Sequence, residues 1–321
     1  MKIYGKRLIY SYSLLCGWAS MFDIVTLGHF SIDIIELGAE PPRRALGGPP
    51  TYVSLAARTL GASVSVVSKV GGDFSCEYRR WLETRGIDLS PLKIVPDAQT
   101  TSFLLKYTRG KRRLRLLKRA PPIEAEDLPD WLHAKIIHVA PIAGEVGGET
   151  VNKAKGLAGI LSVDPQGFVR AFNHEGWTRL TAMRNPKILK AFSIFKASVE
   201  EAEVITGASN ISSAVRKVHG FGVEIVILTM GVEGALLSRG NGAYKVPSCK
   251  PEVVRDTTGA GDAFIGAFLA EYLKGRDPVW CACVGSAAAS IIIEDVGPSI
   301  LRDRKDVYER ARGAYEGVVK V

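Results

Sequence analysis

Short apolar runs alternate with amphipathic segments along most of the chain, and this alternation constrains the fold more than any other feature. The apolar runs are 24–27, 64–67, 136–140, 159–163, 194–196 and 224–228. Segments with helical spacing lie between them, among them 51–60, 77–85 and 212–218. Strands that are apolar throughout and alternate with helices indicate a parallel sheet covered on both faces. We therefore expect an α/β/α sandwich.

Two regions interrupt this alternation. Residues 32–46 read as short extended pieces, and residues 101–118 read as a hairpin with a tight turn at 109–111. Together they predict a small antiparallel sheet that could serve as a lid, although a surface hairpin without a role fits equally well. Because no internal repeat and no long flexible linker divides the chain, we expect residues 21–321 to form one domain.

Residues 1–20 resemble a short signal peptide, with a basic start and an apolar stretch broken by Ser and Tyr. The stretch is shorter than the ~20 residues of a membrane span. Met21 directly precedes an apolar run, so we expect Met21 to be the functional start and the preceding peptide to be an extension or a mis-set start. An appended strand or helix is the alternative. Five dispersed cysteines argue against a secreted disulfide scaffold. A cytoplasmic protein without a membrane partner is expected.

The strongest chemical signal is the run Asp-Thr-Thr-Gly-Ala-Gly-Asp-Ala-Phe at 256–264, which follows an extended segment and opens a helix. The small residues Gly259, Ala260 and Gly261 allow close approach of a ligand. A helix N-terminus offers free N–H groups and a dipole that favours an anion such as phosphate. Asp262 lies in the same turn, and a carboxylate beside a bound phosphate is electrostatically unfavourable. Its presence is explained if it takes a proton from an attacking hydroxyl. An Asp that only caps the dipole is the alternative.

Common nucleotide-binding and metal motifs are missing from the sequence. It contains no G-x-x-x-x-G-K-[ST] and no G-x-G-x-x-G between a first strand and helix. A Walker-type NTPase is therefore excluded, and a dinucleotide-binding domain is disfavoured. Cys281 and Cys283 have no second pair and no nearby histidine, so a zinc site is not expected.

The run 256–264, followed by Gly-Ala-Phe, resembles the C-terminal signature of the ribokinase (PfkB) family of carbohydrate kinases. Other segments agree with that family in the expected order: Gly28 with Asp33, Gly47-Gly48, Val70 to Asp73, and Thr229 to Gly234. The resemblance spans roughly residues 22–299. It implies a ribokinase-like, Rossmann-type α/β/α sandwich with a small β lid, and phosphoryl transfer from a nucleotide to a sugar-type hydroxyl.

The resemblance also implies roles for individual residues. Asp262 would be the base, and the backbone N–H groups of 259–261 would form an anion hole for the developing charge. The remaining positions are Asp33, Gly47, Gly48 and Tyr52 on the substrate side, and Thr229, Gly231 and Gly234 on the nucleotide side. The donor would be ATP or ADP with Mg²⁺. Sugars, cyclitols and nucleosides are the expected acceptors, and the chain would be a monomer or a lid-mediated homodimer.

The resemblance also implies two cation sites, and the first of them departs from the family pattern at one position. The family's N-x-x-E motif for Mg²⁺ is matched by Glu201, but Ser198 replaces the asparagine. A serine can still bond a metal-bound water, so a water-mediated Mg²⁺ site remains expected. A solvated first helical turn is the alternative for these acidic residues. Asp256 and Thr258, with Ser299, resemble a monovalent-cation site and imply K⁺ activation.

The substrate segments depart from the pattern as well. Tyr52 stands where ribokinase-like members usually carry a sugar-binding Asn, and it follows two prolines. An aromatic wall makes ribose less suitable and a ring polyol such as myo-inositol more suitable, and the loop resembles archaeal cyclitol or nucleoside kinases of the family. Asp164 is expected at a strand's carboxyl end, the usual ligand edge. Arg170 could meet a phosphate or lie on a surface loop.

The formal charge of +9 raises the question of a polyanionic partner. Seven of the eleven residues 109–119 are Lys or Arg. Without interleaved aromatics or a nucleic-acid-binding motif, specific nucleic-acid binding is not expected. A solvated lid hairpin is the favoured interpretation, and attraction of an anionic nucleotide or phosphorylated substrate is the alternative. A catalytically silent relative that binds a ligand or nucleic acid as a regulator is the rival to the kinase.

Overall fold

A computed structural model describes residues 21–37, 41–108, 111–298 and 303–321. The extension expected at 1–20, Ser299 and the centre of the turn at 109–110 lie outside these residues. Within the described ranges, no helix has the length and apolar character needed to cross a membrane.

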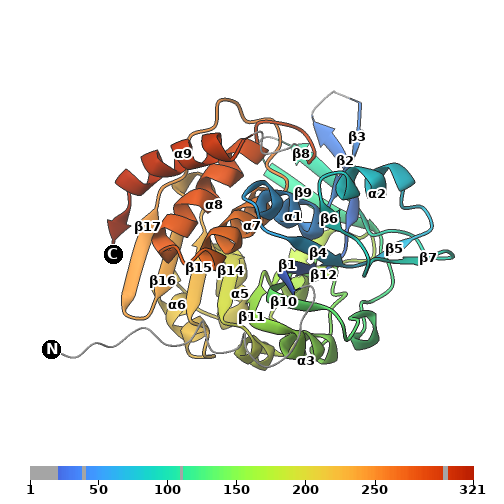
Figure 1. The fold of residues 1–321 in the computed structure, drawn as a ribbon, viewed down its shortest axis with the longest axis horizontal. Coiled ribbons are helices and arrows are strands. Elements are labelled where there is room, and N and C mark those ends of the chain that lie inside the picture. Colours follow the sequence, from blue (N-terminus) through green and yellow to red (C-terminus); the bar gives the residue numbers. More distant parts are fainter. Residues whose placement is uncertain (1–20, 38–40, 109–110, 299–302) are drawn as a thin grey trace.

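A twisted sheet flanked by helices forms the centre of the molecule (Figure 1). Its ten described strands are, from edge to edge, β18 (Val319–Lys320), β17 (Gly242–Val246), β16 (Ala235–Arg239), β15 (Ile225–Thr229), β14 (Ile194–Ser198), β11 (Ala158–Val163), β10 (His133–Val139), β1 (Met21–Leu27), β4 (Val64–Val67) and β6 (Ile87–Asp88). The six expected strands are confirmed. The sheet is not wholly parallel as expected, because β16, β17 and β18 add an antiparallel edge.

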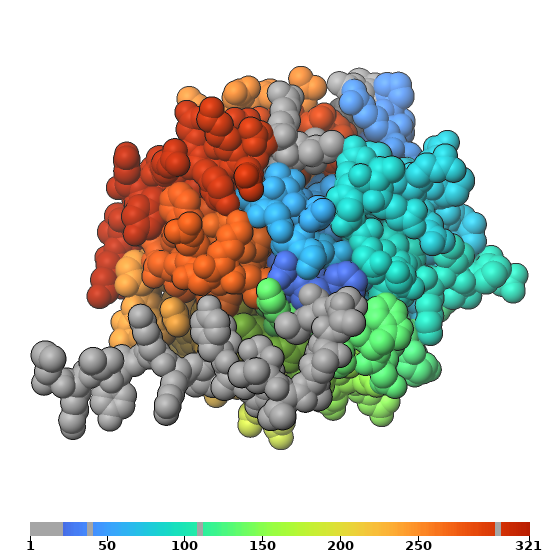
Figure 2. All heavy atoms as spheres, in the orientation of Figure 1, coloured from blue at the N-terminus to red at the C-terminus, as the bar shows by residue number. Residues whose placement is uncertain are grey.

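Helices cover both faces of this sheet, as the apolar strands require. One face carries α1 (Pro49–Thr59), α7 (Ala260–Leu273), α8 (Pro278–Ile292) and α9 (Arg304–Glu316), and the other carries α3 (Gly148–Leu157), α5 (Val199–Thr206) and α6 (Ile211–His219). Successive residues of a strand point to opposite faces of the sheet. Ile24 therefore packs against α1 and α7, while Val25 packs toward α3. Figure 2 shows α1 between the orange-to-red C-terminal helices and the cyan segment that carries α2 (Cys76–Glu83).

A separate four-stranded sheet forms the lid. Its order is β3 (Arg43–Gly47), β2 (Ser31–Leu37), β8 (Ser102–Thr108) and β9 (Lys111–Lys118). The expected extended pieces are confirmed, but the sheet is mixed rather than antiparallel, because β2 and β8 run parallel. A parallel neighbour requires a long crossover, and here the main-sheet strands β4 and β6 and the short pair β5 (Lys69–Gly71) and β7 (Lys93–Val95) lie between them in the chain.

A small hairpin from the main body fastens onto the lid. The one-turn helix α4 (Gln166–Val169) leads into β12 (Arg170–Phe172) and β13 (Thr178–Leu180). The Leu116 N–H of β9 donates to the Gly176 carbonyl at 2.8 Å, and Arg115 forms a β-bridge with Trp177. Gly176 has φ +88°, and a Cβ there would lie 2.2 Å from the Leu116 oxygen. The contact therefore requires glycine.

Candidate active site

A pocket of about 520 Å³ lies between the lid and the carboxyl ends of the central strands. Thr229 ends β15 and Ser198 ends β14, while Gln166 and Ile142 follow β11 and β10. This is the edge where ligands bind in open α/β sheets. The expected residues that line the pocket are Asp33, Gly48, Tyr52, Thr229, Glu201, Thr258, Gly259, Gly261 and Asp262, and the structure therefore brings together segments from almost the entire chain.

The first turn of α7 forms the floor of the pocket. Gly259 caps the helix with φ +78°, and a Cβ there would lie 2.4 Å from the Tyr52 ring. A Cβ on Gly261 would lie 2.6 Å from Nζ of Lys196. The two glycines therefore allow a tyrosine ring and an ammonium group to pack directly against the start of the helix. The start of this helix therefore lies in the pocket beside an ammonium group, a combination that suits an anion.

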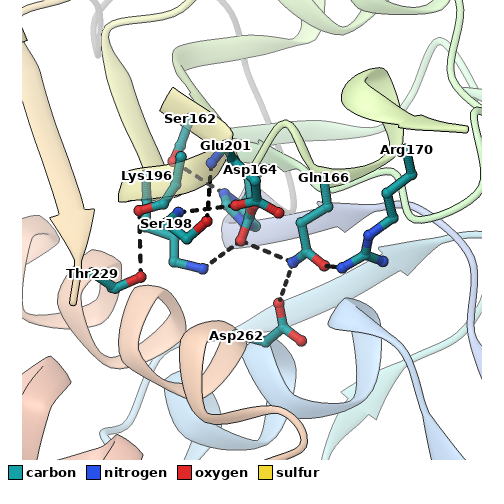
Figure 3. A network of polar contacts seen from close by, with 11 residues as sticks. Ser162, Asp164, Gln166, Arg170, Lys196, Ser198, Glu201, Thr229 and Asp262 are labelled. Carbon is teal, nitrogen blue, oxygen red and sulfur yellow. Dashed lines mark hydrogen bonds and ion pairs between the residues drawn. The ribbon is translucent and has the colours of Figure 1, made fainter. Parts of the chain in front are cut away.

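A polar network connects Asp262 to the neighbouring strand ends (Figure 3). The side-chain nitrogen of Gln166 donates to Asp262 Oδ1 at 3.3 Å and to Asp164 Oδ2 at 3.1 Å. Lys196 donates to Asp164 Oδ2 at 2.6 Å, and both side chains are buried. Arg170 donates a hydrogen bond to the side-chain amide oxygen of Gln166. Asp262 is therefore held in place by an amide rather than neutralised by an ion pair of its own.

Burial and charge set the protonation of this network. Burial raises the pKa of Asp262 to about 6, against the opposing effect of the Lys196 ammonium. Burial alone would lower the pKa of Lys196, but the carboxylates of Asp164 and Asp262 outweigh it and raise that pKa above its ordinary value. At neutral pH, Asp262 is thus largely ionised and able to accept a proton, and Lys196 carries its charge.

Asp33 from the lid strand β2 lies at the other end of the pocket. Its Oδ1 accepts a 2.7 Å hydrogen bond from Ser31, and it is only 5% exposed. Burial raises the pKa of Asp33 to about 7, and the Ser31 bond opposes this effect. Gly47 leaves room for this carboxylate, since a Cβ there would lie 2.1 Å from Asp33 Oδ2 and would force the Asp33 side chain to move. Gly48 has φ +83° and caps α1.

Tyr52 and the two prolines before it differ from their expected setting. We expected the two prolines to stiffen a loop, but Pro49 and Pro50 form the first turn of α1. This position suits proline because its missing N–H has no helical partner. Tyr52 is 1% exposed, and its ring packs against Gly259 and the hydrophobic core. It lines the pocket floor, so contact with a substrate stays a prediction.

The residues expected on the donor side divide into two groups. Thr229 lines the pocket, whereas Gly231 and Gly234 shape the turn behind it and do not line it. Ser198 and Glu201 form a capping box at the start of α5: Ser198 Oγ accepts from the Glu201 N–H at 3.2 Å, and Glu201 Oε2 accepts from the Ser198 N–H at 2.9 Å. Both line the pocket with Glu200, so the acidic turn faces the pocket instead of being fully solvated.

These carboxylates fit the way in which proteins hold Mg²⁺. No group of three or more His, Cys, Asp or Glu side chains suited to a metal occurs among the described residues. Mg²⁺ is usually held by one or two carboxylates, waters and substrate phosphates rather than by a cage of protein ligands. Glu200 and Glu201 would supply such carboxylates beside a bound donor.

The expected monovalent-cation loop contacts the lid. Asp256 Oδ1 accepts hydrogen bonds from Tyr107 of β8 at 2.6 Å and from the Thr258 hydroxyl at 2.7 Å. Asp256 Oδ2 is buried and has no hydrogen-bond partner within the described part of the chain. A buried carboxylate oxygen without a partner is costly, so this atom fits a cation. The expected third member, Ser299, lies outside the described residues.

Among the pocket residues that were not assigned roles from sequence are Lys196, Gln166 and Arg112. A lysine inside an otherwise apolar strand was an available signal for Lys196, because buried lysines are rare without a partner. Gln166 and Arg112 reach the pocket only through contacts between distant segments, which no local sequence pattern predicts. The basic segment of the lid is not a fully solvated hairpin as favoured, since Arg112 and Arg113 line the pocket and Arg113 stacks 4.2 Å from the Trp177 ring.

Comparisons with known proteins agree with this geometry. The chain is 30% identical over 281 residues to a cytidine kinase of Thermococcus kodakarensis, covering 86% of this chain and 98% of the relative. It is 30% identical over 309 residues to an inositol 3-kinase of Oryza sativa subsp. japonica, covering 89% and 73%.

Solved structures share the fold. A pyrophosphate-dependent kinase of the ribokinase family, complexed with a pyrophosphate analogue and myo-inositol, superposes with a TM-score of 0.74 at 24% identity, covering 89% of this chain and 99% of that chain. The model of the pfkB family of carbohydrate kinases matches residues 21–304. The chain therefore belongs to the pfkB family of carbohydrate kinases.

Proposed function

We propose that this kinase transfers the terminal phosphoryl group of Mg²⁺–ATP to a hydroxyl group of a nucleoside or a cyclitol, with Asp262 as the base. The observation that carries this proposal is the position of Asp262. Its carboxylate lies in the first turn of α7 and lines one pocket with the buried ammonium of Lys196, which lowers its pKa, and with Asp33.

The chemistry follows from the arrangement of these groups. The terminal phosphate would lie against the N–H groups of residues 259–261 and the Lys196 ammonium, which stabilise negative charge. Asp33 would accept a hydrogen bond from an acceptor hydroxyl and hold it near Asp262. Asp262 would take the proton as the oxygen–phosphorus bond forms. Mg²⁺, held through Glu200 and Glu201, would neutralise charge on the donor phosphates.

Nucleotide donors are supported by the loops at the donor end. The turn after β15 carries Val232, which is 92% exposed, and the loop before Asp256 carries the exposed Val253 and Val254. Exposed apolar side chains in loops beside a phosphate site suit the flat face of a base. Pyrophosphate has no base and would not contact these side chains. Because one solved relative is a pyrophosphate-dependent kinase, pyrophosphate has to be tested beside ATP as a donor.

The acceptor end of the pocket favours a nucleoside over a cyclitol. Its walls include the apolar side chains of Phe103, Leu114, Ile142, Trp177 and Leu180. A polyol ring presents hydroxyl groups on every side, whereas a nucleoside presents a flat base that apolar and aromatic walls can cover. The cytidine kinase relative is consistent with this choice, and the inositol kinase relative keeps myo-inositol as the second candidate.

A coupled assay tests the proposal. Cytidine, other nucleosides, myo-inositol, ribose and fructose 6-phosphate are tested with ATP, ADP and pyrophosphate as donors. We expect turnover of a nucleoside with ATP, and Asp262→Asn should lower kcat by roughly 10³-fold or more with the melting temperature little changed. No turnover of any acceptor would favour the silent regulator, and near-normal turnover by Asp262→Asn would contradict its role as base.

A further inference from the structure

A buried histidine lies where the lid joins the body. His29 is fully buried between β1 and β2, and it is not one of the residues that line the pocket. The parallel strands β2 and β8 begin side by side here, with the Ile32 N–H donating to the Thr101 carbonyl at 2.9 Å. β9 ends beside them, because Lys118 pairs with Ser102. The chain therefore crosses between body and lid three times close to His29.

The imidazole ring of His29 connects these three crossings. Its Nε2 lies 3.0 Å from the Pro121 carbonyl oxygen after β9, and its Nδ1 lies 2.9 Å from the Thr101 hydroxyl before β8. The Thr101 hydroxyl also accepts from the Ala120 N–H at 3.0 Å. A carbonyl oxygen can only accept, so Nε2 carries the proton and donates to Pro121, while Nδ1 accepts from Thr101. All the donors of the ring and of this hydroxyl are therefore used.

The surroundings favour the neutral ring that this arrangement requires. Burial lowers the pKa of His29, and the Glu145 carboxylate opposes this effect. A neutral imidazole offers one donor and one acceptor on a rigid ring, so it can connect a hydroxyl to a carbonyl without burying a charge. Glu145 fastens the same place to the body, because its carboxylate accepts from the His29 N–H at 3.0 Å and from the Ala143 N–H at 2.7 Å. The fourth crossing lies against it as well, since a Cβ on Gly48 would lie 2.4 Å from the His29 carbonyl oxygen.

These residues form one largely buried cluster, which we call the lid junction: His29, Thr101, Ala120, Pro121 and Glu145. Two pocket residues follow closely in the chain. Asp33 lies four residues after His29, and Phe103 lies two residues after Thr101. The two residues are partners across β2 and β8. Because hydrogen-bonded strands move together, a shift of the lid junction is passed on to the Asp33 carboxylate.

We propose that His29 and Thr101 are positioning residues, which make the lid junction the fixed pivot of the lid and thereby place Asp33 against the acceptor. This inference rests on the proposed function, in which Asp33 binds an acceptor hydroxyl. The donor would be held by α7 and by the ends of the body strands, which do not belong to the lid. Loss of the pivot should therefore impair use of the acceptor and spare binding of the donor.

Thr101→Val and Thr100→Val form a matched pair for the test. Each removes a buried hydroxyl that accepts one backbone N–H, from Ala120 at Thr101 and from Gly71 at Thr100, but the Thr101 hydroxyl also bonds to His29. We expect Thr101→Val to lower kcat/KM for the acceptor by about tenfold or more, with the donor KM changed by less than about twofold. Thr100→Val should keep the acceptor kcat/KM within about twofold of wild type. Thr101→Ser retains the hydroxyl and should recover most of the loss.

Two further measurements do not depend on turnover. Amide hydrogen exchange should be faster in all four lid strands of Thr101→Val than in those of Thr100→Val, with equal exchange in the main sheet. NMR of the wild-type chain with ¹⁵N-labelled histidine should show His29 neutral at pH 7 with its proton on Nε2; its signals are the ones that disappear in His29→Gln. If the wild-type chain phosphorylates none of the acceptors, the proposed function fails, and these two measurements still decide whether the lid junction is the pivot.

Other outcomes would overturn the inference. Equal acceptor kcat/KM in Thr101→Val and Thr100→Val, or a donor KM raised as much as the acceptor KM, would reduce the lid junction to a contact that only stabilises the fold. A charged His29 ring, or a proton on Nδ1, would contradict the hydrogen bonds on which the pivot depends. If Thr101→Val does not fold, His29→Gln takes its place with the same expected loss, because glutamine can donate to Pro121 but has no acceptor at the position of Nδ1.

Discussion

Asp262 and Asp33 show how the surroundings of a single residue set its chemistry. Burial raises the pKa of both carboxyl groups. At Asp262 the Lys196 ammonium is the largest opposing effect, and the pKa is about 6. At Asp33 a hydrogen bond from Ser31 opposes burial less effectively, and the pKa is about 7. One pocket therefore holds a carboxylate that is mostly ionised at neutral pH and another that is close to half protonated.

Activity should depend on pH through Asp262. A base acts only when ionised, so kcat should fall as the pH drops through about 6, the pKa of Asp262. The measurement is kcat for the best acceptor between pH 5 and 8.5 with saturating donor. Asp33→Asn is the control that distinguishes titration of Asp262 from titration of Asp33. The fall of kcat near pH 6 should persist in this variant, because Asp262 is unchanged. A profile that stays flat down to pH 5 would contradict the assignment of the base.

Asp33→Asn should also change the pH dependence of stability. Because the pKa of Asp33 is raised to about 7 in the folded state, the folded chain holds this proton more tightly than the unfolded chain, whose carboxyl group titrates near 3.8. Stability from this group is fully present below the unfolded pKa and is lost as the pH rises toward 7. The melting temperature of Asp33→Asn relative to wild type should therefore be higher at pH 8 than at pH 5.

The control for this measurement is Asp97→Asn, which changes an exposed carboxyl group in the loop before β8. It should shift the melting temperature equally at the two pH values. An equal shift for Asp33→Asn would contradict a raised pKa, whatever the activity of the variant.

At the scale of elements, two polar contacts help to fasten the lid to the body, beside the packing of its strands on Ile142 and Ala143. One is the hydrogen bond from Tyr107 of β8 to Asp256, and the other is the docking of the hairpin at 170–180 onto β9. Asp256 and Asp262 belong to the same short segment before and within α7. The Tyr107 hydroxyl therefore links the lid to the loop that leads into α7.

Tyr107→Phe should loosen this link without unfolding the chain. A hydrogen bond to a carboxylate stabilises by about 1.5–3 kcal/mol, and its loss should speed amide exchange in β8 and β9 and raise the acceptor KM. Hydrogen exchange followed by mass spectrometry measures the first effect. Tyr78→Phe in α2, which packs beside Phe74 away from the pocket, is the matched control. Unchanged exchange of the lid strands in Tyr107→Phe would contradict the link.

Which elements could be predicted depended on whether their signal was local. β4 and β14 follow from apolar runs, and the start of α7 follows from its glycines and Asp262. At the antiparallel edge, β17 is mostly half-buried and β18 is a two-residue exposed strand, so both carry a weaker pattern. The hairpin at 170–180 depends on a contact between Gly176 and Leu116, 60 residues apart in the sequence. Lys196 and Gln166 acquire partners only when β11 and β14 pair with their ends in register.

At the scale of the whole molecule, the structure changes the meaning of the positive charge. Of the five basic side chains described in this segment of the lid, Arg112 and Arg113 line the pocket, Arg115 donates to the Glu175 carbonyl, and Arg119 lies 5.3 Å from the Phe172 ring. Only Lys118 is exposed without such a contact. These charges do not form a continuous surface that could follow a phosphate backbone. Two of them, Arg112 and Arg113, line a pocket that is expected to receive an anionic donor.

The charge should therefore act on the donor and not on nucleic acid. We expect the KM for ATP to rise between 50 and 300 mM salt because exposed charges attract the donor over distances that salt screens. Labelled duplex DNA should show no saturable binding at micromolar protein in physiological salt, since non-specific binding requires several phosphate contacts at once. Fluorescence anisotropy measures the second expectation, with Lys118→Met as a charge-matched control for Arg112→Met. Micromolar DNA binding that ATP displaces, and that Arg112→Met weakens more than Lys118→Met, would assign the lid to a polyanionic partner instead.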